Sequence, residues 1–490
     1  MRTGSKRTAT LAAAGLSLAA WQSAGAADLP ATPVYKEPAV VAGPSWTGFY
    51  INAGGGYGLW SAETTTRTTP GAPTPPMTTN SRQGGSGWLG RVGAGFDYQF
   101  TSRIVGGVFG DFDFSDIEGT IVDPAPAIAG QIKQTHSWAV GARAGLLATP
   151  NILTYWNGGY TSARFSSASM HDAGAGLIAP PGAATGDTTP SFTANGWFLG
   201  GGTDMALTSF GPGWYWRNEY RYAYYKNHVL TDTGTNAFLP INNSFNFKPT
   251  VQTVTTQLVY KFNPGLKSAT YEGGGAVPPV SWTGLYVGGG IGYGMWAADT
   301  SATTTPLTQT QGGKGWLGRA TVGYDYQLSP LFVAGLFADA DGSSLKGTIQ
   351  DAGGAVLGDI KQSWSWAAGG RVGLAFTPGI LGFVNGGYTS AHFSSANLVF
   401  SIPPAIAGTS SGFSTSEFDT SGWFVGGGVE FGVGLLGAGW FWRNDYRFAQ
   451  YESQTLSEKN AAGFVPSSIS FKPQVQTITT SLIYKFNWGG

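Results

Sequence analysis

The chain has 490 residues, of which 77 are glycine, none is cysteine and only 11% are charged, and its formal net charge is zero. The zero net charge argues against a nucleic-acid-binding protein, and the lack of cysteine excludes a disulfide scaffold and a thiolate metal site. Hydrophobic residues make up 42% of the chain and aromatic residues 14%, which argues against intrinsic disorder. Because soluble proteins carry about 25% charged residues, this composition indicates a surface that meets a solvent other than water.

The N-terminal segment has the order of a secretory signal peptide. Basic residues within 2–7 precede an apolar stretch over 11–20, and the small residues 24–26 stand at cleavage spacing. We therefore predict a cleaved signal peptide over 1–26, because the apolar stretch is shorter than the ~20 residues that a retained membrane anchor needs. No run of about 18 apolar residues follows it, so an exported, aromatic-rich chain of this kind indicates a closed β-barrel.

The remainder of the chain is a duplication. The segment 157–163 recurs unchanged as 385–391, and 216–221 recurs as 442–447 with a single Glu-to-Asp change. The two copies, called here repeat 1 and repeat 2, span 46–262 and 282–486. The Pro-rich segment 27–45 and the Gly/Pro-rich segment 263–281 are predicted to be linkers, and 487–490 is a short tail.

Within each repeat the hydrophobic residues alternate with a period of two, which is typical of a strand with one apolar face. Along 88–98, for example, Trp88 and Val92 share one face, whereas Arg91 and Asp97 share the other. Eight such strands are expected in each repeat. In repeat 1 they span roughly 48–61, 86–100, 104–119, 131–148, 152–166, 195–209, 213–226 and 247–262.

Short and long connections alternate between these strands, as in outer-membrane barrels that have short periplasmic turns and long outer loops. We therefore predict an all-β fold, a transmembrane antiparallel β-barrel, arranged as two tandem eight-stranded barrels. One sixteen-stranded barrel is the alternative. Separate closure is favoured because each repeat has its own closing strand and a nearly balanced set of inward charges, which suits the filled interior of a narrow barrel.

Several motifs resemble a known family. The run Trp46-Thr47-Gly48-Phe49-Tyr50 follows a Pro-rich segment, glycine-rich strands come next, and Tyr260-Lys261-Phe262 closes the repeat. This order is similar to Gram-negative outer-membrane β-barrel proteins described as immunogenic or porin-like, with an OmpA-like eight-stranded barrel. The resemblance covers 46–262 and again 282–486. It implies a location in the cell outer membrane, after export through the inner membrane, in contact with outer-membrane lipid.

The closing strands of both repeats resemble the assembly signal of that family. The resemblance implies that the barrel-assembly machinery recognises them during biogenesis by strand pairing. The residues of this expected signal are Tyr260, Phe262, Tyr484 and Phe486.

The few charged residues of the strands fall on the face that would line the barrel. The expected lumen charge network consists of Arg91, Asp97, Asp111, Asp113, Arg143, Asp204, Arg217, Glu219 and Arg221, with Arg319, Asp325, Asp339, Asp341, Arg371, Glu430, Arg443, Asp445 and Arg447 in repeat 2. Because an unpaired buried charge is costly, a paired network that fills the lumen is favoured. A charged constriction that selects solutes is the alternative.

The four histidines give no pattern of a catalytic or metal site. His136 corresponds to Trp364 and His392 to Arg164, so neither recurs between the repeats, and His171 and His228 are expected in outer loops. His136 lies on the lipid-facing parity of its strand. We therefore expect no catalytic residue, no metal and no cofactor. No candidate axial ligand for haem recurs between the two repeats.

These observations favour an outer-membrane protein with a structural role in envelope integrity, or with a narrow, nonspecific passage for small solutes. A sixteen-stranded general diffusion porin is the alternative. A surface adhesin or ligand-binding barrel, for example one for haemin, is a second alternative. We expect no enzymatic activity and no nucleic-acid partner.

Overall fold

The computed structural model describes residues 44–67, 78–123, 128–173, 180, 182–207, 210–234, 244–262, 281–303, 308–351, 356–377, 379–401, 408–433 and 436–486. The predicted signal peptide over 1–26, nearly all of both predicted linkers and the tail 487–490 lie outside these residues. In the described part of the chain, no helix is long and apolar enough to span a bilayer.

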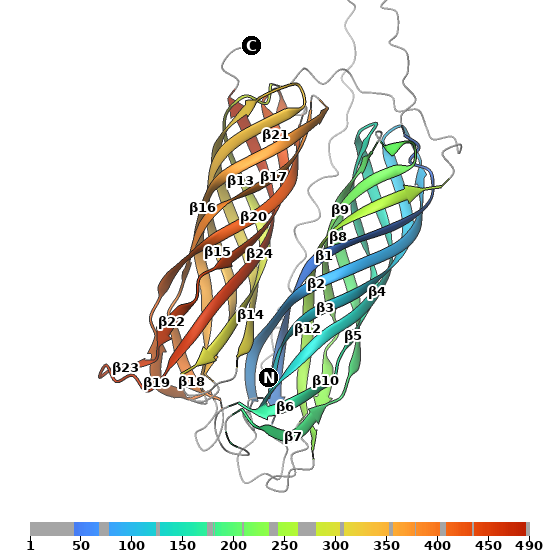
Figure 1. Ribbon diagram of the computed structural model, residues 1–490. Helices are drawn as coiled ribbons and strands as arrows, with labels where there is room; N and C mark the ends of the chain where they lie inside the picture. The colour runs from blue at the N-terminus through green and yellow to red at the C-terminus, as the bar shows by residue number, and fades with distance from the viewer. Residues whose placement is uncertain are drawn as a thin grey trace, which may run out of the picture. The chain divides into compact units, whose positions relative to one another are not determined.

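Antiparallel strands form almost all of the described chain (Figure 1). The long strands of repeat 1 are β1 (Gly48–Arg67), β2 (Thr78–Gln99), β3 (Ile104–Asp123), β4 (Ile128–Thr149), β5 (Ile152–Phe165), β8 (Phe192–Ala206), β9 (Trp214–Tyr225) and β12 (Ser244–Lys261). Those of repeat 2 are β13 (Gly284–Ala302), β14 (Gln309–Gln327), β15 (Phe332–Asp351), β16 (Val356–Thr377), β17 (Ile380–Phe393), β20 (Phe418–Gly432), β21 (Trp440–Tyr451) and β24 (Ser468–Phe486).

Short strands lie in the long connections of both repeats. They are β6 (Ala168–Asp172), β7 (Ala184–Thr189), β10 (His228–Thr231) and β11 (Thr233–Gly234) in repeat 1, and β18 (Ala396–Phe400), β19 (Ser410–Thr415), β22 (Gln454–Ser457) and β23 (Lys459–Asn460) in repeat 2.

The strand pairing returns to its starting strand within each repeat. In repeat 1 each long strand pairs with the next, and β12 pairs back with β1. In repeat 2 the same order ends with β24 paired to β13. A single pair, Gln83 with Gln311, links β2 to β14, so all 24 strands belong to one sheet.

The register is staggered by the same amount in both repeats. Partner residues followed once around repeat 1 lead from Tyr224 through Trp197, Tyr160, Val140, Gly110, Ala94, Ile51 and Tyr260 to Trp214, ten residues from the start on the same strand. The equivalent path in repeat 2 leads from Gln450 to Trp440, which is the same offset. With eight strands this stagger tilts each strand by about 40° from the axis.

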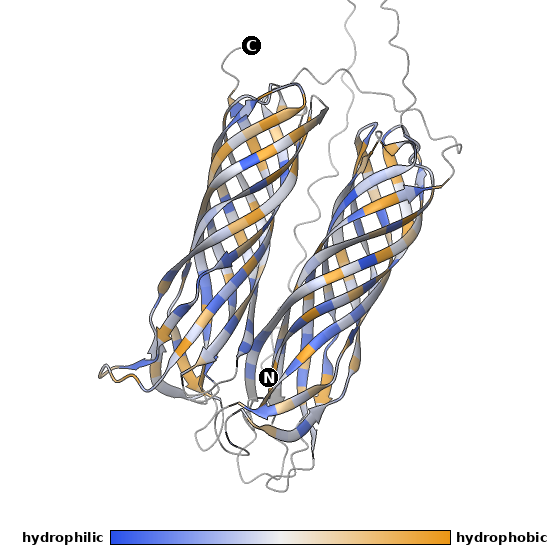
Figure 2. Cartoon of the chain, viewed as in Figure 1, coloured by the Kyte–Doolittle hydropathy of each residue, from blue (hydrophilic) through white to orange (hydrophobic). Residues whose placement is uncertain are grey.

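Hydrophobic and hydrophilic residues alternate along the strands (Figure 2). The exposed residues form an apolar outer face, and the buried residues form a mixed inner face. Outward aromatic and aliphatic side chains are widely exposed; Trp88 is 72% exposed and Leu336 is also 72% exposed. Inward side chains are buried, as in Arg91 and Asp97. A soluble protein rarely exposes so much apolar surface, so this face fits a lipid environment.

The predicted strands are too short at the end that carries the long connections. The expected connection 62–85 is partly strand, because β1 continues to Arg67 and β2 begins at Thr78. Along 62–67 and 78–85 mostly polar residues and glycine occupy both parities, so alternation no longer indicates a strand although the backbone still pairs. A bulge between Gln134 and His136, where the register shifts against both neighbouring strands, changes the facing of β4, and Ile132 is therefore buried although it shares the parity of the exposed Trp138.

Candidate functional site: the charged interior of each repeat

The inward charges of repeat 1 gather in two clusters. The turn-side cluster, near the short turns, consists of Asp97, Arg143, Asp204, Arg217 and Lys261; the loop-side cluster consists of Arg91, Asp111, Asp113, Glu219 and Arg221. The first has three cations and two anions, and the second has two cations and three anions, so the two clusters together are neutral.

In the turn-side cluster each cation contacts a carboxylate directly. Arg143 donates to both oxygens of Asp97, at 2.8 and 2.5 Å, and also to Asp204 Oδ2 at 3.1 Å. Arg217 donates to both oxygens of Asp204, at 2.7 and 2.8 Å, and Lys261 Nζ lies 2.5 Å from Asp97 Oδ2. Such paired, hydrogen-bonded geometry is what a buried charge requires.

Aromatic rings cover the turn-side cluster. Trp46, which precedes β1, is 1% exposed, and its Nε1 donates to the carbonyl oxygen of Pro150 at 2.9 Å. The Lys261 ammonium lies 5.1 Å from the centroid of the Trp46 ring, and the Arg143 guanidinium lies 4.9 Å from that of Tyr50. The Trp-Thr-Gly motif thus places its tryptophan as a lid on this end of the interior, held partly by cation–π contacts.

The loop-side cluster joins four strands through Glu219. Arg91 donates to both oxygens of Asp113, at 2.6 and 2.8 Å, and to Glu219 Oε1 at 2.8 Å. Glu219 Oε2 accepts from Tyr155 Oη at 2.9 Å and from Asn157 Nδ2 at 2.8 Å. Every carboxylate oxygen of Glu219 therefore has a donor.

An apolar core fills the interior beyond the loop-side cluster. Trp60 is fully buried, and its ring centroid lies 5.7 Å from that of Phe247. Phe165 stacks on Phe192 at 5.1 Å. The charges are thus enclosed between the Trp46 lid and this aromatic core.

Repeat 2 reproduces both clusters with its own residues. Its turn-side cluster consists of Asp325, Arg371, Glu430, Arg443 and Lys485, and its loop-side cluster of Arg319, Asp339, Asp341, Asp445 and Arg447. Trp282 takes the place of Trp46 and is fully buried, with the Lys485 ammonium 4.6 Å from its ring centroid.

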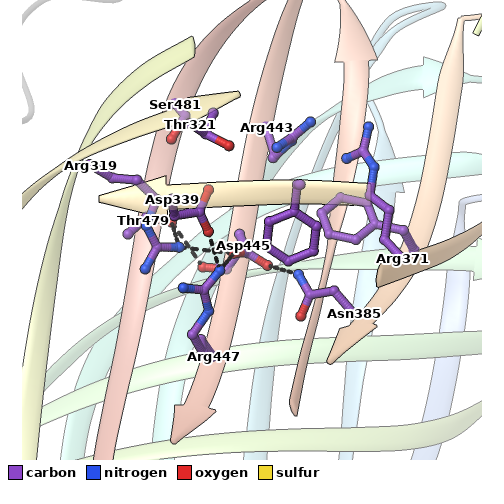
Figure 3. Close-up of a pocket in the computed structure, with 12 residues that line it drawn as sticks. Arg319, Thr321, Asp339, Arg371, Asn385, Arg443, Asp445, Arg447, Thr479 and Ser481 are labelled. Atoms are coloured by element: carbon purple, nitrogen blue, oxygen red, sulfur yellow. Dashed lines mark hydrogen bonds and ion pairs between the residues drawn. The ribbon is translucent and has the colours of Figure 1, made fainter. Parts of the chain in front are cut away.

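A cavity adjoins the loop-side cluster of repeat 2. The space open to the centre of a water molecule is ≈ 10 Å³, which is about that of one water. Figure 3 shows Asn385 of β17 beside Asp445 and Arg447 of β21, and Asn385 Nδ2 donates to Asp445 Oδ1 at 3.1 Å. Asn385 Oδ1 and Thr321 Oγ1 are buried without a hydrogen-bond partner, so polar atoms are left for a water to bridge.

All eighteen predicted lumen charges lie on the inner face, in the clusters given above. Lys261 and Lys485 also belong to the turn-side clusters but are absent from the predicted network, although Lys261 shares the parity of the inward Gln257. The role of Trp46 and Trp282 was not predicted either. Two features of the sequence could have indicated this role: both tryptophans lie on the inward parity, and both stand directly before a strand.

The residues of the expected assembly signal lie on the outer face. Phe262 is 43% exposed, and its ring lies 5.1 Å from Tyr260; Tyr484 and Phe486 repeat this pair at 5.0 Å. His136 stacks on the outward Phe112 at 5.5 Å, away from both charge clusters. Among the described residues, no group of three or more His, Asp or Glu side chains is arranged to hold a metal ion.

No protein-family model matches the chain. The 31 kDa outer-membrane immunogenic protein of Brucella melitensis biotype 1 is 29% identical over 249 residues, which cover 49% of this chain and 94% of that protein. The protein of the same name from Brucella suis biovar 1 gives the same values. This chain is a Gram-negative outer-membrane β-barrel protein. Its location is the cell outer membrane, as the sequence predicted.

Among solved structures, a FadL homologue of Pseudomonas aeruginosa shares 11% identity with this outer-membrane barrel, over 90% of this chain and 91% of the other, with a TM-score of 0.24. The attachment invasion locus protein of Yersinia pestis shares 12% identity, over 42% of this chain and 99% of the other, with a TM-score of 0.20. Scores of this size carry no argument about function.

Proposed function

We propose that this outer-membrane protein inserts as two separately closed, eight-stranded barrels with filled interiors, and that it has a structural role in the envelope rather than that of a wide diffusion channel. The observation that carries the proposal is the neutral, paired set of charges enclosed in each repeat. An open aqueous channel would hydrate its charges and would not require balance within each half.

Three further observations support separate closure over a sixteen-stranded barrel. The pairing of β1 with β12 extends over Tyr50–Arg67, and that of β13 with β24 over Leu285–Ala302. Both repeats have the same stagger of ten residues. The Brucella relative matches about half of this chain over nearly its whole length, as expected for a single-repeat relative.

Conductance of the refolded full chain in planar bilayers tests the filled interior. We expect the wild type to show no large conductance steps. The lid variant Trp46→Ala with Trp282→Ala should also show none, because the aromatic core still closes the other end of each interior. Trp88→Ala, which alters an outward ring that is 72% exposed, is the matched control and should conduct like the wild type. Wide, porin-like steps from the wild type would contradict the proposal.

Cleavage of the linker tests separate closure. A protease site placed within 263–281 of the full chain is cut after folding, and the products are run on a gel with and without boiling. Two separately closed barrels give two bands, each of which shifts on boiling. A sixteen-stranded barrel gives one unboiled band, which separates into halves only after heating.

For biogenesis, we propose that the outward pairs Tyr260–Phe262 and Tyr484–Phe486 form the signal that the barrel-assembly machinery recognises. The cleaved signal peptide over 1–26 is part of the same proposal. Phe486→Ala should lower the amount of folded protein in the outer membrane, whereas refolding of the purified variant in detergent should stay unchanged. If both yields fall equally, Phe486 acts in folding alone.

A further inference from the structure

A buried carboxyl group lies where the chain changes partner strands at the outer end of repeat 1. Asp232 follows β10, which pairs with β12, and precedes β11, which pairs with β7. Its side chain is 0% exposed, and neither of its oxygens has a hydrogen-bond donor. A polar group buried in this way normally has a partner.

The neighbours of Asp232 are also acids. Its carboxyl group lies within hydrogen-bonding reach of Asp123, the last residue of β3, which is itself 0% exposed. The Asp187 carboxylate on β7 faces the same place, and a Cβ added at Gly234 would lie 1.7 Å from Asp187 Oδ1. Two ionised carboxylates can only accept hydrogen bonds, so the contact between Asp232 and Asp123 requires a proton between them.

The same pair recurs in repeat 2 with one residue changed. Glu458 stands between β22 and β23 as Asp232 stands between β10 and β11, and it faces Asp351 at the end of β15. Both are buried, at 2% and 0% exposed. The third acid is absent, because Phe413 occupies the register position of Asp187. Conservation of the pair between two divergent repeats points to the pair itself as the functional unit.

Both pairs lie outside the lipid-facing band. On the outer face of β3 the exposed Phe114 is followed by Asp116 and Glu118, which are exposed, so the strand has left the apolar zone before it reaches Asp123. The pairs belong to the end that carries the long connections, which faces the exterior in outer-membrane barrels. They therefore experience the pH of the surroundings.

We propose that each pair binds one proton between its two carboxyl groups and thereby holds β10–β11 against the end of β3, and β22–β23 against the end of β15. We call this contact the proton latch. It is strongest in acid and loosens as the external pH rises, because the separated carboxyl groups release the shared proton.

The titration of the pairs agrees with this arrangement. Burial, followed by the charge of Asp123, its hydrogen bond and the charge of Asp187, raises the pKa of Asp232 to about 9. Burial, with the charge and hydrogen bond of Asp351, raises the pKa of Glu458 to about 8. When the latch opens, each pKa returns towards its ordinary value of 3.8 or 4.5. The closed form therefore holds one extra proton between these limits, and opening becomes about tenfold more favourable per pH unit.

Hydrogen exchange of the full chain in detergent, followed between pH 5 and 8 and corrected for the intrinsic rate of amide exchange, tests the latch. In the wild type we expect protection of 228–234 and of 454–460 to fall about tenfold per pH unit. Asp232→Asn keeps a neutral hydrogen-bond donor in place of the protonated carboxyl group. It should abolish the slope in 228–234 and leave it in 454–460, and Glu458→Gln should do the reverse. Asp116→Asn, an exposed acid on β3, should behave like the wild type.

The experiment has clear contrary outcomes. Protection that does not change with pH in the wild type overturns the latch, and this result needs no variant. A slope retained by Asp232→Asn also overturns it; if that variant does not fold, Asp123→Asn neutralises the other member of the pair. If millimolar calcium chloride at pH 8 restores protection in the wild type but not in Asp232→Asn, the pair binds a divalent cation instead of a proton, and the proposal is wrong.

Discussion

The two repeats hold the same charges but surround them differently. In repeat 1, Glu219 accepts from Tyr155 and Asn157, and Gln257 Oε1 accepts from Asn52 Nδ2 at 2.7 Å. In repeat 2 the corresponding residues are Asp445, Phe383, Asn385, Ser481 and Gly288, so four of the five side chains are shorter or lack their polar group. The cavity lies among these shortened side chains.

This difference separates what the fold requires from what it tolerates. The signs and positions of the charges persist through a divergence that removed a hydroxyl group, a methylene group and two carboxamides. A charge left without its partner inside the barrel would cost several kcal/mol, whereas a lost neutral contact costs about 1 kcal/mol, and water can occupy the space. Charge pairing is therefore the stricter constraint on the interior.

Removal of a buried cation should have the largest effect on stability. Arg221→Leu leaves Asp111 and Glu219 without their bonds of 2.8, 2.6 and 2.9 Å, and we expect a loss of about 3–5 kcal/mol in the free energy of unfolding of repeat 1. Urea unfolding followed by fluorescence measures it. Arg447→Leu should cost less, because Arg447 donates a hydrogen bond to Asp339 but lies 3.8 Å from Asp445.

The matched control for these variants is Lys346→Met. Lys346 pairs with Asp359 at 2.8 Å, but both side chains are more than half exposed, so the expected change is about 0–1 kcal/mol. If the loss measured for Arg221→Leu falls in the same range, the loop-side cluster is hydrated. Charge pairing would then not be a stricter constraint on the interior than packing.

Removal of the hydroxyl group that repeat 2 already lacks should have an intermediate effect. Tyr155→Phe deletes the donor to Glu219 Oε2, and we expect a loss of about 1–3 kcal/mol, since the bond is made to a charged group. The reverse change, Phe383→Tyr, should gain less than Tyr155→Phe loses, because the carboxyl group of Asp445 is one methylene shorter. An equal gain would show that the two clusters are interchangeable.

Among the variants of the interior, the smallest loss is expected from a change that makes repeat 1 resemble repeat 2 around its cavity. Gln257→Ser removes the acceptor of Asn52, and we expect a cost of about 1–2 kcal/mol, moderated if a water enters the space. Urea unfolding measures the loss in the free energy of unfolding for this variant and for Arg221→Leu. The ratio of the two losses compares the cost of a lost neutral contact with the cost of a lost charge pair. A cost as large as that of Arg221→Leu would mean that packing constrains the interior as strictly as charge does.

The sequence predicted the inner face well and the connections poorly, for a physical reason. Alternation is enforced only where one side of the wall meets lipid, so the parity of Arg91 and Asp97 was evident while the outer ends of β1 and β2 were not. The partners within each cluster could not be read from the sequence, because Arg143 reaches Asp204 only through the stagger of the sheet. Asp123 and Asp232 lie in segments without a hydrophobic alternation, so the sequence did not indicate whether their side chains point inward or outward.

The equal stagger of the repeats bears on how such a protein can evolve. Eight strands at this tilt set a wall radius of about 8 Å, so trimming side chains can enlarge the interior only up to that backbone limit. Duplication within one ring would double the circumference and enlarge the enclosed cross-section about fourfold. Duplication into two rings, as proposed here, adds a second interior of the same width. It therefore doubles the area of outer loops that one chain exposes at the cell surface, without changing the size of solute that either interior could admit.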